Sequence, residues 1–149
     1  MPPRTTKPLT LYDELEKFRS LTSEAITRVA LGAWRVAVDA TPKKPSPPLP
    51  HYQRTGRLAA GWKLNTGRNV GLIPAVGQYG DPSGYKPDFR FDVKKDRAVR
   101  LYNNVPYAEY VENGVGNNAP PPRLMLKKAT EYFDSRINSE FNKMNLKKL

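Results

Sequence analysis

Two acidic residues of the segment PYAEYVEN, Glu109 and Glu112, have a spacing that could support chemistry. Three residues apart on a helix, they share one face, where two carboxylates could act as paired acids or bind a cation. An active site needs several convergent groups, and the other carboxylates are few and interleaved with basic residues. A pair of this kind is more often a solvated helix face or a salt-bridge site between subunits, so we interpret Glu109 and Glu112 as interface residues.

Other site chemistries lack the residues that they need. The chain has no cysteine and one histidine, His51, which excludes thiol catalysis, thiolate metal sites and multi-histidine metal sites. The glycines Gly114 and Gly116 do not follow an expected strand, and no phosphate-binding GxxxxGK[ST] motif occurs. We therefore expect no enzyme activity, no catalytic residue, no metal and no cofactor.

A mixture of basic and aromatic residues raises the question of nucleic-acid binding. The mixture consists of Tyr52, Arg54, Arg57, Trp62, Lys63 and Arg68. Surfaces that bind single strands combine these residue types. However, Trp62 falls in phase with Leu58, as on the buried side of a strand, so we interpret Trp62 as a core residue. A basic nucleic-acid-binding accessory protein stays the alternative function.

The charge of the chain is concentrated in its middle third. The 149 residues contain 25 Lys or Arg and 14 Asp or Glu, for a net charge of +11. Residues 51–100 hold ten of the basic and four of the acidic residues. Such a field favours a polyanion or an acidic protein partner, although it also fits a solvated surface. No apolar run approaches the ~18 residues of a membrane span, so we expect no membrane contact.

The length fits a single domain, residues 1–149, whose ordered elements are joined by long loops. Residues 1–9 are proline-rich and predict a flexible arm. Residues 41–57 include a proline-rich stretch and predict a stiff loop. Residues 77–88 and 114–122, rich in turn-forming residues, predict exposed loops.

A long N-terminal helix is predicted from the cap Thr10 to about Val38. Asp13 completes a capping box with Thr10, and Pro42 ends the helix. Its core stripe has residues at steps of three or four, apart from a gap filled by Thr22: Leu11, Leu15, Phe18, Ala25, Val29, Ala33 and Val36.

Strands are expected between His51 and Asn104. Leu58–Leu64 predicts a strand. Apolar and polar residues then alternate over 89–93 and 99–102 around Lys94-Lys95-Asp96, which predicts an antiparallel hairpin with one buried face.

Two helices follow the expected strands. Pro106–Asn113 predicts a short helix with Gly114 as its left-handed exit. A last helix begins near Arg123, and its stripe consists of Leu126, Ala129, Phe133, Ile137, Phe141 and Met144. We expect an α+β domain, a small antiparallel sheet packed on one face by the long N-terminal helix and the C-terminal helix.

Three segments occur in an order and spacing that resemble a known family. They are Thr55-Gly56-Arg57-Leu58, Tyr107-Ala108-Glu109-Tyr110-Val111-Glu112-Asn113-Gly114, and Pro122-Arg123-Leu124-Met125 followed by Lys128-Ala129. Together they resemble the tail-completion (head–tail joining, minor-tail-type) proteins of long-tailed bacteriophages, over about residues 10 to 143.

The resemblance implies a structural virion protein without enzyme activity. Such proteins form a ring, commonly of six copies, in the neck region between the head–tail connector or adaptor and the tail tube or tail terminator protein. They assemble in the host cytoplasm, and a ring on the path of packaged DNA would touch DNA without sequence specificity. We expect the assembly interface to include Arg54, Arg57, Tyr107, Glu109, Tyr110 and Glu112, because tyrosine is enriched at protein contacts and basic loops could meet the acidic pair of the next copy.

Overall fold

A computed structural model describes residues 11–41, 56–67, 71–76, 79, 86–114 and 122–144. Their elements are the helix α1 (Leu11–Ala40), the short helix α2 (Arg57–Ala60), the strands β1 (Trp62–Asn65) and β2 (Arg100–Asn103), and the helices α3 (Ala108–Asn113) and α4 (Met125–Lys143). The predicted arm and most of the three predicted loops lie outside the described residues.

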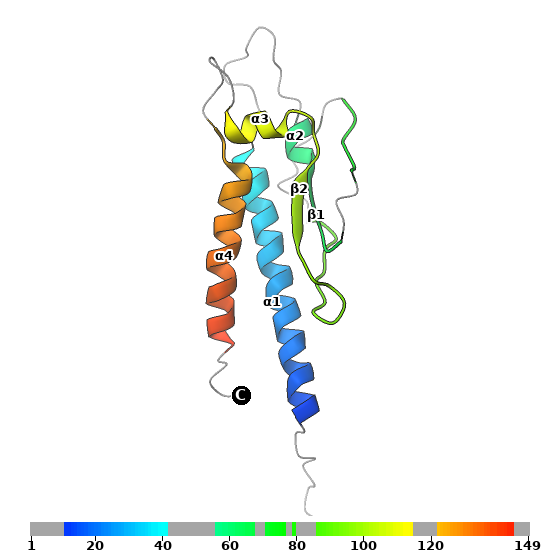
Figure 1. The fold of residues 1–149 in the computed structure, drawn as a ribbon, viewed down its shortest axis with the longest axis vertical. Coiled ribbons are helices and arrows are strands. Elements are labelled where there is room, and N and C mark those ends of the chain that lie inside the picture. Colours follow the sequence, from blue (N-terminus) through cyan, green and yellow to red (C-terminus); the bar gives the residue numbers. More distant parts are fainter. Residues whose placement is uncertain are drawn as a thin grey trace, which may run out of the picture.

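The expected α+β fold is confirmed, and α1 lies at its centre. In Figure 1, α1 runs between α4 on one side and the two strands on the other. The strands form an antiparallel sheet in which Trp62 is opposite Asn103 and Asn65 is opposite Arg100. The helices α2 and α3 lie together at one end of this arrangement. The two neighbours of α1 therefore pack against it from two sides.

The helix α1 has a wider buried face than a single stripe. Thr22, Ala25, Val29 and Ala33 of the predicted stripe are buried, and so are four further residues of the helix, Ala30, Trp34, Ala37 and Val38, and Thr41 directly after it. Many of these residues are alanine, which allows the neighbouring elements to approach the helix closely. Thr22 is tolerated because its hydroxyl donates to the carbonyl oxygen of Phe18, one turn earlier, at 2.8 Å.

The predicted hairpin is wrong in its pairing and in the burial of Val93, which is 37% exposed, and right in its turn and in the burial of Phe89 and Phe91. Phe89 and Phe91 are buried, and the amides of Lys95 and Asp96 both donate to the carbonyl oxygen of Asp92 to close the turn. However, β2 pairs with β1, and residues 89–93 are not part of the two-stranded sheet in the described part of the chain.

The backbone of residues 89–93 is bonded to α1. The amide of Phe91 donates to the hydroxyl of Thr27 at 2.9 Å, and the amide of Val93 donates to the hydroxyl of Ser23 at 3.0 Å. These hydroxyls satisfy donors that a second strand would otherwise have to satisfy. The extended segment is therefore held by hydrogen bonds to α1. Its backbone amides do not need the neighbouring strand that the predicted hairpin would have provided.

The prediction of a strand over Leu58–Leu64 is confirmed only in its second half. Its first residues form α2, and only Trp62–Asn65 is strand. Gly56 precedes α2 with φ 82° and ψ 0°, a left-handed conformation that redirects the chain. The two alanines that follow Leu58 are strong helix formers. Trp62 is buried, which confirms that it is a core residue.

The two later helices agree with the sequence except at the start of α4. Ala108–Asn113 is helical, and Gly114 follows with φ 62°, as expected of a left-handed exit. In α4, Met125 and Ala129 are buried, whereas Leu126 is 41% exposed. The predicted stripe therefore begins one residue too late, because Met125 contacts the end of α1.

A buried polar cluster joins three elements. The indole of Trp62 donates to the hydroxyl of Thr41 at 2.7 Å, and that hydroxyl lies 2.7 Å from the carbonyl oxygen of Ala37 and 3.1 Å from the sulfur of Met125. The indole of Trp34 donates to the backbone oxygen of Trp62 at 3.2 Å. Both tryptophans thus keep their polar atoms paired inside the core, which a buried indole requires.

Replacing Thr41 with valine should leave the buried indole N–H of Trp62 without an acceptor. We expect Thr41→Val to lower the free energy of unfolding by about 1–3 kcal/mol, the usual cost of such a group, measured by urea denaturation. Thr130→Val is the matched control, because Thr130 makes the same hydroxyl bond to the carbonyl four residues earlier at an exposed site. Equal losses in the two variants would contradict the role of Thr41.

Replacing Gly56 with alanine should strain the start of α2. A Cβ there would lie 2.7 Å from the backbone oxygen of Tyr79, and the left-handed φ is itself unfavourable for alanine. We expect Gly56→Ala to lower the free energy of unfolding by about 1–3 kcal/mol. Gly67→Ala, where a Cβ would meet nothing within 4 Å, should change it by less than about 0.5 kcal/mol. A Gly56→Ala variant as stable as Gly67→Ala would refute this account.

Candidate assembly interface

Most of the predicted interface residues in the described chain lie at the end formed by α2 and α3 (Figure 1). Arg57 begins α2, Tyr107 directly precedes α3, and Glu109 and Glu112 belong to α3. Arg54 and the side chain of Tyr110 are outside the described part of the structure. The fold thus brings residues from two distant parts of the sequence to one end of the molecule.

Arg57 connects three segments at this end. Its Nε donates to the carbonyl oxygen of Pro74 at 2.9 Å. Its guanidinium carbon lies 5.9 Å from the ring centroid of Tyr107, within the range of a cation–π contact. Arg57 therefore holds the segment 71–76 next to α2 and α3.

The segment 71–76 exposes large apolar side chains. Leu72 is 59% exposed, Ile73 48% and Val76 85%. Single apolar residues are normal on a protein surface, but three large ones exposed within one six-residue segment are typical of a contact site. The sequence shows an apolar run here, interrupted by Pro74, without indicating whether it is buried. We call Leu72, Ile73 and Val76 the apolar edge.

Glu112 caps the N-terminus of α4. Its carboxylate accepts from the amide of Leu126 at 2.7 Å and from the amide of Lys127 at 3.3 Å. Leu124, before the helix, has φ 51° and makes no side-chain cap. The carboxylate of α3 supplies the missing acceptor, and its charge also favours the positive end of the α4 dipole.

The backbone strengthens this junction between α3 and α4. The amide of Arg123 donates to the carbonyl oxygen of Val111 at 3.0 Å, and the amide of Leu124 donates to that of Glu112 at 3.2 Å. The end of one helix and the start of the next thus satisfy each other. The two acidic residues differ accordingly, because Glu109 is exposed while Glu112 is bound within the chain.

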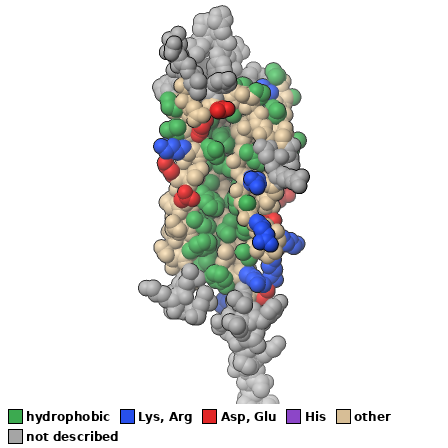
Figure 2. All heavy atoms as spheres, viewed as in Figure 1, with side chains coloured by type: hydrophobic (Ala, Val, Ile, Leu, Met, Phe, Trp, Pro, Cys, Tyr) green, Lys and Arg blue, Asp and Glu red, His purple; other side chains and the backbone are tan. Residues whose placement is uncertain are grey.

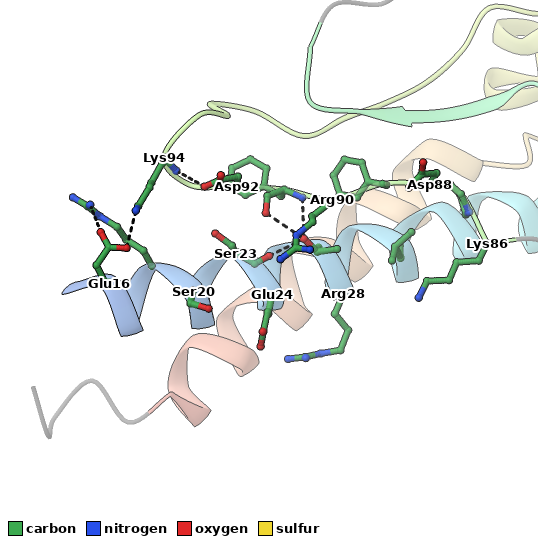
Figure 3. A pocket seen from close by; sticks show the side chains of 16 residues that line it. Glu16, Ser20, Ser23, Glu24, Arg28, Lys86, Asp88, Arg90, Asp92 and Lys94 are labelled. Atoms are coloured by element: carbon green, nitrogen blue, oxygen red, sulfur yellow. Dashed lines mark hydrogen bonds and ion pairs between the residues drawn. The ribbon is translucent and has the colours of Figure 1, made fainter. Parts of the chain in front are cut away.

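An open groove of about 1140 Å³ lies between α1 and residues 86–94 (Figure 3). Charges of both signs line it. Glu16 is held by Lys94 at 2.6 Å and by Arg19 at 3.1 Å. The hydrogen bond from Lys94, aided by the charges of Lys94 and Arg19, keeps the pKa of Glu16 below its usual value. The groove was not predicted, because it depends on residues 89–93 lying against α1.

Of the two aromatic residues of the predicted nucleic-acid surface, Tyr52 lies outside the described residues and Trp62 cannot stack on bases. Trp62 is buried and its indole is bonded to Thr41. Among the described residues, no group of three or more His, Cys, Asp or Glu side chains is placed to hold a metal ion. None of the helices within the described ranges combines the length and the apolar character needed to cross a membrane.

Comparison with known proteins found no relative. No protein-family model, no curated protein and no solved structure matches this chain.

Removing the carboxylate of Glu112 should destabilise the junction between α3 and α4. We expect Glu112→Ala to lower the free energy of unfolding by about 0.5–2 kcal/mol, the usual cost of a lost helix cap, measured by urea denaturation. Glu109→Ala is the matched control on the same helix and should stay within about 0.5 kcal/mol of the parent chain. A loss at Glu109 as large as at Glu112 would contradict the assigned cap.

Proposed function

We propose that this chain is a structural subunit of a bacteriophage tail-completion ring at the head–tail junction of a siphophage-like virion. It acts by protein–protein assembly, with copies of itself, with the tail tube or tail terminator protein, and with the head–tail connector or adaptor. The resemblance of its three sequence segments to that family is the starting point of the proposal.

The fold supports the proposal by bringing those three segments together. Arg57 of the first contacts Tyr107 of the second, and Glu112 of the second caps the helix that begins in the third. Leu58, Met125 and Ala129 belong to one buried cluster, against which Tyr107 and Val111 pack. Residues far apart in the sequence thus form one structural unit. We expect this if the three segments define a fold shared with that family together with its contact surface at the α2–α3 end.

The observation that carries the proposal is the exposed apolar edge. Its three aliphatic side chains are too exposed to contribute much to the stability of a single chain. Burying them against another protein would remove apolar surface from water, which is the main driving force of association. Arg57 fixes the backbone of the edge at Pro74, so docking would require less ordering.

The charges supply an orientation for the contact between copies. Glu109 is exposed at the α2–α3 end, whereas Glu112 is occupied by α4. In the proposed ring, a basic loop of the next copy meets this acid. Different surfaces meeting head to tail produce a ring when the rotation closes. Glu109 is therefore the acidic residue that we assign to the contact.

Assembly tests this function. We expect the purified chain to form rings in electron micrographs, alone or on tail tubes, with a matching mass by light scattering. Leu72→Ser should weaken ring association by at least about fivefold, the effect of losing about 1 kcal/mol of contact energy. Leu21→Ser is the control, because Leu21 on α1 is also exposed, at 43%.

Two outcomes would contradict the proposal. A chain that stays monomeric and has no affinity for tail tubes or connectors does not act as a ring subunit. An equal loss of association in Leu72→Ser and Leu21→Ser would show that the apolar edge is not the contact surface. Glu109→Ala offers an independent measurement, since it should weaken the ring without changing the stability of the isolated chain.

A further inference from the structure

A group of basic side chains lies where the turn after residue 92 meets the first turns of α1. Figure 2 shows Lys and Arg side chains gathered toward this end of the molecule, on the side of the sheet. We call the group the basic tip; it consists of Lys17, Arg19, Arg90, Lys94, Lys95 and Arg97, all exposed. The ion pair from Lys94 to Glu16 holds the turn and α1 together, and Arg19 of α1 pairs with the same carboxylate.

Three acidic residues next to these basic side chains are engaged within the chain. Asp92 accepts from the amide of Lys94 at 2.9 Å, and Asp96 accepts from the amide of Asp92 at 2.8 Å. Glu16 is shared by Lys94 and Arg19. Residues 16–19 and 90–97 together contain six basic residues and these three acids, for a formal charge of +3. The acids stabilise the turn, and the excess positive charge points to a partner that carries many negative charges.

Lys95 and Arg97 are the residues best suited to meet that partner. Both are exposed, Lys95 in the turn and Arg97 shortly after it. Since the neighbouring acids are held by backbone amides, a negatively charged ligand could approach these two cations without first breaking an ion pair. Lys17 on α1 is exposed in the same region.

A nucleic-acid duplex fits the tip better than a protein does. Protein contacts require a buried apolar centre, and Val93, 37% exposed, is the one large exposed hydrophobic residue of the described segment 86–100. Phosphate contacts require charge and hydrogen-bond donors only. Single strands are held by exposed aromatic residues, whereas Phe89 and Phe91 are buried. We propose that the basic tip binds the phosphate backbone of double-stranded nucleic acid without reading its sequence.

This inference goes beyond the proposed assembly function and does not depend on it. The basic tip and the apolar edge share no residue, so either can be removed while the other is kept. Binding to nucleic acid at the tip would be measured on the full chain whether or not rings form.

The test is a salt titration with a short, fluorescently labelled DNA duplex, followed by anisotropy between about 50 and about 200 mM NaCl. We expect binding of the parent chain to weaken steeply, because each phosphate contact contributes about 0.9 to the slope of log K against log salt. The double variant Lys95→Gln with Arg97→Gln should bind more weakly and lose up to about 1.8 of that slope.

A matched control separates the tip from the overall charge. Lys127→Gln with Lys128→Gln removes the same charge from exposed positions on α4, and it should retain the slope of the parent chain. Lys17→Gln adds a variant on a different element, and it should remove about 0.9 of the slope on its own. It keeps the test decisive if the double variant in the turn fails to fold, which circular dichroism would detect.

Three results would overturn the proposal. The first is no binding by the parent chain at the lowest salt concentration. The second is an equal loss in the tip and control variants, which would attribute binding to net charge alone. The third is competition by polyglutamate as effective as that by unlabelled duplex at equal charge, which would identify an acidic protein segment as the partner.

Discussion

The hydrogen bond from the indole of Trp62 to the hydroxyl of Thr41 is the contact on which the arrangement of elements depends. It joins the first residue of β1 to the residue that follows α1, and the same hydroxyl contacts Met125 at the start of α4. Trp34 returns a hydrogen bond to the backbone of Trp62. Since an unsatisfied buried indole is costly, few other placements of β1 on α1 would satisfy both tryptophans at once. This contact therefore also fixes the position of the end of the molecule that carries α2 and α3.

The role of α1 explains how so small a sheet can organise the domain. The helix buries alanine and tryptophan against its neighbours, and it also offers hydroxyl groups to an extended segment. Ser23 and Thr27 act where a neighbouring strand would act, since they accept from the amides of Val93 and Phe91. A two-stranded sheet in isolation is marginal, and here α1 supplies the packing and some of the hydrogen bonds that additional strands would give.

The elements that depend on local signals could be predicted from the sequence. The helices carry apolar periodicity, and Gly114 ends α3 as its position suggests. The alternation around Phe89 and Phe91 correctly indicated burial, but alternation says nothing about which group accepts the backbone amides, so the pairing was wrong. The helical start of the segment after Gly56 was missed because the left-handed turn there acts on the backbone and leaves the apolar pattern unchanged.

The same limit applies to the candidate interface. That Arg57 approaches Tyr107, and that Glu112 caps α4 while Glu109 is exposed, follows from the tertiary fold and could not be predicted from spacing.

The packing of α1 on α4 has a consequence for biosynthesis. The sheet and α3 lie between the two helices in the sequence, so α1 leaves the ribosome long before α4 is translated. Until α4 is made, the alanine-rich face of α1 that packs against it is exposed to solvent. Because exposed apolar surface promotes aggregation, the nascent chain is most vulnerable to aggregation during this interval.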